Sequence, residues 1–118
     1  MSNYGSDPTR DEIPPGTLYM LVMRTLARHG ELHGYEISNA IQQISGDVLQ
    51  VEEGSLYPAL ARMLVKGWVA AEWGISENNR KARYYRLTPA GRSQLTHEMS
   101  KWERVVRAVN QVLRPAEE

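Results

Sequence analysis

The chain has 118 residues, a length typical of one domain with a modest core. Its residues are 42% hydrophobic and 24% charged, which excludes wholesale disorder, and it has no cysteine, which excludes disulfides and thiolate chemistry. The net charge is zero, but charge distribution rather than the total decides whether a polyanion can bind. We find no signal peptide and no apolar run of membrane-spanning length, and we expect a cytoplasmic protein without a membrane partner.

The first half of the chain predicts a polar lead-in and two amphipathic helices. Residues 1–15 are rich in proline, glycine and aspartate and predict a flexible N-terminal arm. A helix over about residues 16–28 follows, and it ends at His29-Gly30. A second helix opens at His33 and carries apolar residues at helical spacing, namely Ile37, Ala40, Ile41 and Ile44.

Residues 55–66 predict a short helix with one buried and one polar face. Leu56, Ala59, Leu60, Met63 and Leu64 form its apolar stripe. Ser55 is the predicted N-cap, and Pro58 fits only if the helix has just begun. No acidic residue occurs in this segment, and hydroxyl and basic groups lie off the stripe at Ser55, Tyr57, Arg62 and Lys66. With the preceding helix, this pattern predicts a helix-turn-helix whose second helix enters a DNA major groove.

Residues 68–73 and 83–87 predict two strands joined by a polar turn, which would form a wing. Arg80 and Lys81 lie near its tip and Arg83 begins its second strand. Residues 78–97 contain five basic residues and no acidic one, which favours binding to phosphates or a minor groove over a role in solubility alone. Tyr35, at the start of the second helix, either donates to a phosphate or packs half-buried.

The last segment predicts a long helix, with Thr88 as N-cap and Pro89 at the first helical position. Six apolar residues alternate at spacings of four and three, as in a coiled coil: Leu95, Met99, Trp102, Val106, Val109 and Leu113. A helix of about 25 residues is roughly 38 Å long, more than so small a domain can cover. We therefore predict a homodimer through these residues. The fold is mainly α with a small β-hairpin: a winged helix-turn-helix over 16–87, then a dimerisation helix and tail over 88–118.

Four linked motifs carry a resemblance to a known family. They are Gly-Tyr-Glu-Ile at 34–37, Gly-Ser-Leu-Tyr-Pro-Ala-Leu at 54–60, Gly-Trp-Val at 67–69 and Arg-Tyr-Tyr-Arg-Leu-Thr-Pro-Ala-Gly at 83–91. In this order the chain resembles the PadR-type transcriptional regulators, winged helix-turn-helix repressors of bacteria. Its single last helix is similar to that of the short subfamily. The resemblance implies a homodimer that binds a partly palindromic double-stranded DNA operator, Pro58 included in the contact surface, and releases it when an effector binds.

In the multidrug-responsive branch of that subfamily, a tryptophan on the last helix lines a cavity at the dimer centre and stacks on flat aromatic ligands. Trp102 looks like the matching residue, and Met99 and Val106 would flank the ligand. Spacing alone instead favours Trp102 as ordinary dimer core, with Met99 and Val106 as interface residues. Both hypotheses stay open.

Metal binding and catalysis find no support. His29 and His33 are four residues apart, but Gly30 lies between them and no cysteine or third histidine is near, so we expect no metal. No nucleophile motif, phosphate-binding loop or recognisable carboxylate pair occurs, so we expect neither an enzyme nor a cofactor. Two rival hypotheses are a winged-helix protein-interaction module that never binds DNA and a small enzyme that uses the dimer cavity.

Overall fold

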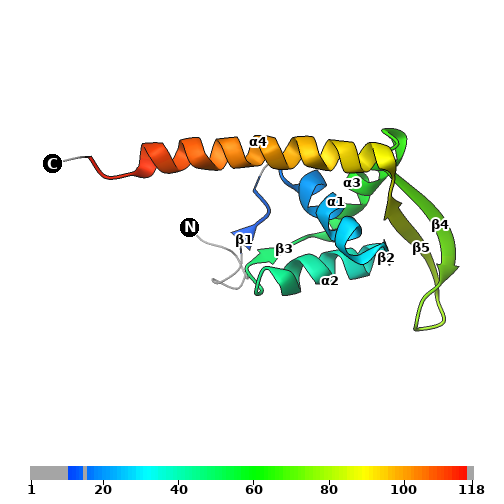
Figure 1. Ribbon diagram of the computed structural model, residues 1–118. Coiled ribbons are helices and arrows are strands. Elements are labelled where there is room, and N and C mark those ends of the chain that lie inside the picture. Colours follow the sequence, from blue (N-terminus) through cyan, green and yellow to red (C-terminus); the bar gives the residue numbers. More distant parts are fainter. Residues whose placement is uncertain (1–10, 15, 117–118) are drawn as a thin grey trace.

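The computed structural model describes residues 11–14 and 16–116 (Figure 1). In this described part of the chain, four helices and two small sheets confirm the predicted class, mainly α with a β-hairpin and a long last helix. In chain order the elements are β1 (Asp11–Glu12), α1 (Leu18–His29), β2 (Glu31–His33), α2 (Gly34–Ile44), β3 (Leu49–Gln50), α3 (Glu53–Val65), β4 (Val69–Ile75), β5 (Lys81–Leu87) and α4 (Pro89–Leu113). Among the described residues, no helix has the length and apolarity that crossing a membrane requires.

The core lies where α1, α2 and α3 meet, under the start of α4 and the base of the hairpin (Figure 1). The predicted apolar stripes supply it, since Ile37 of α2 and Leu60 of α3 have no exposed surface. Burying a side chain of this size stabilises the fold by about 1.5–3 kcal/mol. The other fully or nearly fully buried large side chains are Val22, Met23, Leu26, Leu56 and Met63.

The start of α3 differs from the prediction. The amides of Ser55 and Leu56 both donate to the carbonyl of Glu52, at 3.0 and 2.9 Å, so the first turn closes three residues earlier than expected. Glu52 is the N-cap, and the prediction of Ser55 as cap was wrong. Pro58 consequently lies inside the helix rather than at its start. The missing amide of Pro58 would have bonded to Gly54, which is exposed, so water can hydrate that carbonyl instead.

The predicted wing is confirmed, and it is longer than expected. β4 and β5 pair antiparallel from Val69↔Leu87 to Ile75↔Lys81, which leaves only residues 76–80 for the turn. A third strand that the sequence analysis missed, β2, pairs with the other edge of β5. A strand of three residues is too short to show an alternation of apolar and polar side chains. β2 can therefore be recognised only by its pairing with β5.

A second, two-stranded sheet also departs from expectation. β1 runs parallel to β3, with Asp11 opposite Leu49. Residues 11–12 are thus paired with the body of the protein, although the sequence predicted a flexible arm over 1–15. The rest of that predicted arm, apart from 13–14, lies outside the described residues.

The start of α4 is capped as predicted. The Thr88 hydroxyl accepts a hydrogen bond from the Gly91 amide at 3.0 Å and donates to the Gly67 carbonyl at 2.6 Å. The first half of α4 packs on α1, whereas the second half projects beyond the body of the protein (Figure 1). The longest dimension of the chain, 62 Å, reflects this projection.

Candidate nucleic-acid interface

The outer face of α3 is apolar along its centre. Successive helical residues rotate by about 100°, so Pro58, Ala61 and Val65 lie opposite the buried stripe, and Val65 is 89% exposed. Tyr57 lies on the flank toward α2, and Arg62 lies on the flank toward α1. The predicted polar contacts therefore border the outer face rather than occupy its centre, although all of them are exposed.

Two aromatic residues hold the basic side chains of this flank. The Nε of Arg62 donates to the hydroxyl of Tyr19, on α1, at 2.6 Å. The Tyr19 ring packs edge-on against Trp68, with centroids 5.7 Å apart, and Lys66 Nζ lies 5.1 Å from the centroid of the same Trp68 ring. The bond to Tyr19 uses one of the five N–H donors of Arg62, so the cation is positioned and still able to bind a phosphate.

Tyr57 lies across the beginning of α2. A Cβ added to Gly34 would lie 2.5 Å from the Tyr57 hydroxyl oxygen, so the tyrosine occupies the space that only glycine leaves open. Burial raises the pKa of Tyr57, and the nearby Glu53 and Tyr85 raise it further. The hydroxyl therefore keeps its proton at neutral pH and can donate to a base or a phosphate.

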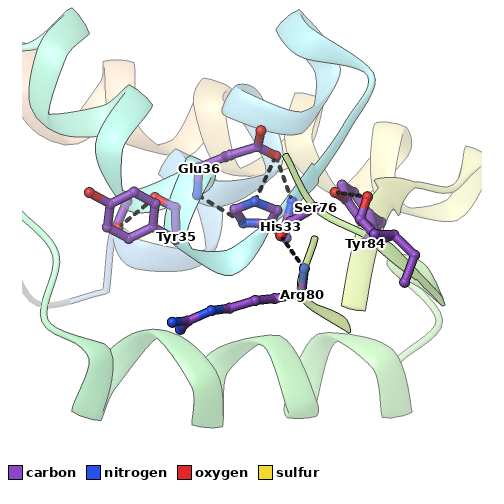
Figure 2. Close-up of polar contacts among 8 residues, drawn as sticks. His33, Tyr35, Glu36, Ser76, Arg80 and Tyr84 are labelled. Carbon is purple, nitrogen blue, oxygen red and sulfur yellow. Dashed lines mark hydrogen bonds and ion pairs between the residues drawn. The ribbon is translucent and has the colours of Figure 1, made fainter. Parts of the chain in front are cut away.

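The beginning of α2 is tied to the wing through His33 (Figure 2). His33 Nδ1 accepts from the Glu36 amide at 3.4 Å, and Glu36 Oε1 accepts from the His33 amide at 3.0 Å, which closes a capping box. The His33 ring packs edge-on against Tyr84 of β5, with centroids 5.3 Å apart. Tyr35 lies beside the His33 ring and is exposed. This exposure does not fit the alternative in which Tyr35 packs half-buried.

The wing tip holds the predicted basic residues, all of them exposed. Arg80 ends the turn, and its amide donates to Ser76 Oγ at 3.4 Å (Figure 2). Lys81 and Arg83 begin β5 and lie over the ring of Trp73, 5.1 and 5.8 Å from its centroid. Trp73 was not predicted as a residue of this site, although its place opposite Arg83 in the hairpin was the signal that could have revealed it.

The six predicted interface residues of α4 divide into two groups. Leu95 is 6% exposed and Met99 packs against the same core, so the chain itself covers them and Leu95 has little surface left for a partner. On the projecting half, Trp102, Val109 and Leu113 are exposed and Val106 is half-buried. Two apolar side chains outside the predicted six, Val105 and Val112, are exposed there as well. A shallow recess of about 360 Å³ on this half is lined by Trp102, Glu103, Val106, Arg107 and Asn110. It includes two of the predicted effector contacts but not Met99.

The family model described as "Transcriptional regulator PadR-like family" matches residues 22–97, from α1 through the wing into α4. The chain belongs to this family. This PadR-like protein is 35% identical over 83 residues to a transcriptional regulator of Mycobacterium tuberculosis, covering 70% of this chain and 74% of that protein. It is 27% identical over 70 residues to the negative transcriptional regulator PadR of Bacillus subtilis, covering 59% of this chain and 38% of that protein.

The fold of this PadR-like protein also matches solved structures. A transcriptional regulator from Clostridium thermocellum superimposes with a TM-score of 0.76 at 27% identity, covering 84% of this chain and 95% of that one. Family and fold agree with the resemblance derived from the sequence motifs. The protein is a DNA-binding transcriptional regulator and not an enzyme.

Proposed function

We propose that this PadR-like regulator is a homodimeric repressor that binds a partly palindromic operator and releases it when a flat aromatic effector binds between the two copies. The observation that carries the proposal is the projecting half of α4, where large apolar side chains are exposed along one stripe. An apolar stripe at a spacing of 3.5 residues is the seam of a coiled coil, and a second copy of α4 is its simplest partner.

The dimer would place one α3 in each of two successive major grooves, about 34 Å apart. Ser55, Tyr57 and Pro58, in the first half of α3, would then contact base edges. The Tyr35 hydroxyl would bind a phosphate. The cations at the flank and wing would bind phosphates as well, namely Arg62, Lys66, Arg80, Lys81 and Arg83. In this arrangement residues 16–87 form the DNA-binding unit and 88–118 the dimerisation segment.

The recess on α4 is the proposed effector site. Its known walls all come from one helix, so a second α4 would have to close it. A flat aromatic ligand stacked on Trp102 would then touch both copies and change the separation of the two α3 helices. Operator affinity would fall because both half-sites could no longer be bound together. Repression, rather than activation, is the role named for the Bacillus subtilis relative.

The wing gives the most direct test of the DNA-binding surface. We expect Arg80→Ala/Lys81→Ala to weaken operator binding and to reduce the slope of log affinity against log salt by about four, because each of the two protomers loses two phosphate contacts. Fluorescence anisotropy at several salt concentrations measures both quantities. Lys101→Ala/Arg104→Ala, which removes two exposed charges from α4, serves as the control and should leave the slope unchanged. An unchanged slope in the wing variant would exclude the wing from the interface.

Gly34 allows a test of Tyr57 without altering α3. A methyl group at Gly34 meets the end of the Tyr57 side chain, which can swing away, so we expect Gly34→Ala to fold normally and displace the tyrosine. Operator affinity should fall about as far as in Tyr57→Ala. In the Tyr57→Ala background, Gly34→Ala should then have no further effect. Losses that simply add in the double variant would show that Gly34 acts independently of Tyr57.

Ligand release is measured in the same titration. A flat aromatic compound that quenches tryptophan emission should lower operator affinity, and Trp102→Ala should abolish both effects. A compound that saturates the Trp102 site while operator affinity stays unchanged would contradict release by an effector.

A further inference from the structure

The wing has two different faces. Because side chains alternate along paired strands, β4 and β5 present one face through Val69, Ala71, Trp73 and Ile75 with their partners Leu87, Tyr85, Arg83 and Lys81. Near the body of the protein this face is buried, as Val69, Tyr85 and Leu87 show. Farther out it leaves the core, and there Trp73 is 60% exposed and Ile75 is 65% exposed. We call these outer four residues, Trp73, Ile75, Lys81 and Arg83, the wing patch.

The opposite face of the wing is already occupied. The Tyr84 ring covers Gly74, where an added Cβ would lie 3.0 Å from the ring. Tyr84 also packs edge-on against His33, which fixes the hairpin to the start of α2 (Figure 2). On the same face Glu72 pairs with Arg86, with 3.5 Å between Oε1 and the guanidinium nitrogen. This face braces the wing, whereas the wing patch has no such packing partner among the described residues.

The wing patch combines apolar and cationic side chains, so it suits a partner that presents both apolar surface and negative charge. Both cations lie over the Trp73 ring, which holds their long side chains beside the apolar surface. None of the four residues is acidic, and Glu72 belongs to the other face. Proteins that bind the DNA minor groove often insert apolar side chains flanked by arginine and lysine. The apolar side chains contact the sugars that form the groove walls, and the cations bind the phosphates along its edges.

The wing patch lies on the same face of the hairpin as Tyr85, which approaches α3. Tyr85, the neighbour of Arg83 along this face, lies close enough to Tyr57 of α3 to affect its titration. The hairpin extends from that position away from the helices (Figure 1). A duplex that contacts Tyr57 would therefore continue along the wing patch.

We propose that Trp73 and Ile75 pack into the minor groove beside each half-site, while Lys81 and Arg83 bind the phosphates on its two sides. The inference rests on the proposed function and assigns the wing an apolar contact in addition to its charges. Such a contact contributes affinity that does not depend on counterion release.

The test compares Trp73→Ala with the unsubstituted protein on two duplexes, one that extends past the half-sites and one that ends at them. On the extended duplex, Trp73→Ala should weaken binding on the order of tenfold, a change of 1.4 kcal/mol. The salt slope should not change, because no phosphate contact is lost. On the truncated duplex both proteins should bind equally. Glu72→Ala/Arg86→Ala, which alters the opposite face without changing net charge, is the matched control.

A second readout follows the ring itself. At saturating extended duplex, tryptophan emission should change in the unsubstituted protein, and this change should disappear in Trp73→Phe. Equal affinities on the extended duplex, or an equal loss on both duplexes, would overturn the inference. Failure of the unsubstituted protein to bind any duplex would instead overturn the proposed function, so the two failures are distinguishable.

Discussion

Val109→Asp/Leu113→Asp should convert the regulator into a monomer and lower its operator affinity by a factor of about 10²–10⁴. Both side chains are exposed on the projecting half of α4, so the chain itself loses no core contact. In the proposed dimer, the new carboxylates of the two copies would be buried at the interface without cationic partners. Their mutual repulsion and the cost of removing them from water would prevent the two helices from pairing. Each released protomer then binds one half-site alone. Analytical ultracentrifugation and operator anisotropy measure the two effects.

The matched control is Ala108→Asp/Gln111→Asp, which adds the same charges to the same stretch of α4 away from the apolar stripe. It should remain dimeric and bind the operator as the unsubstituted protein does. A dimer that survives Val109→Asp/Leu113→Asp would show that another surface joins the two copies.

Gly91→Ala should destabilise the fold more than any surface substitution. The added Cβ would lie 2.1 Å from the Trp68 carbonyl oxygen and 2.6 Å from Leu87 Cδ1. The carbonyl cannot retreat easily, because it accepts a hydrogen bond from the Thr88 amide at 3.1 Å. We expect a loss of about 3 kcal/mol in the free energy of unfolding, the upper range for overpacking in a core. The thermal midpoint should fall on the order of 10 °C.

Gly54→Ala is the control for this substitution, because the space around Gly54 is open for 4 Å and the residue lies in a helix. Replacing such a glycine removes backbone freedom from the unfolded chain, so stability should rise by up to about 1 kcal/mol. Urea unfolding of the three proteins compares these free energies. If Gly91→Ala unfolds at the same urea concentration as the unsubstituted protein, the start of α4 does not lie as close to Trp68 and Leu87 as the structure places it.

The sequence predicts what depends on local periodicity and capping. The buried stripes of α2 and α3 and the Thr88 cap of α4 follow from spacing and side-chain chemistry alone. The start of α3 did not, because Glu52 and Ser55 both stand before the apolar stripe and only the backbone bonds to the Glu52 carbonyl decide between them. β2 and β1 exist through pairing with distant strands, which local patterns do not report.

The same division holds for the candidate interface. The basic residues were identifiable because Arg62 and Lys66 lie off the apolar stripe of α3. The residues that position these cations could not be identified from the sequence. Tyr19, for example, is 43 residues from Arg62 along the chain and contacts it only because α1 packs on α3. Leu95 fits the α4 spacing as well as Val109 does, yet it is buried in the chain's own core because the start of α4 lies over α1.

The decisive measurement is the stoichiometry of operator binding. Duplex from upstream of the chain's own gene would be titrated at a concentration well above the dissociation constant, then again with five base pairs inserted between the half-sites. We predict two protomers per duplex, and a loss of affinity on insertion, because the half-sites would then lie on opposite sides of the helix and beyond the reach of one dimer. One protomer per duplex, or equal affinity for both duplexes, would contradict a dimer that binds two half-sites at once.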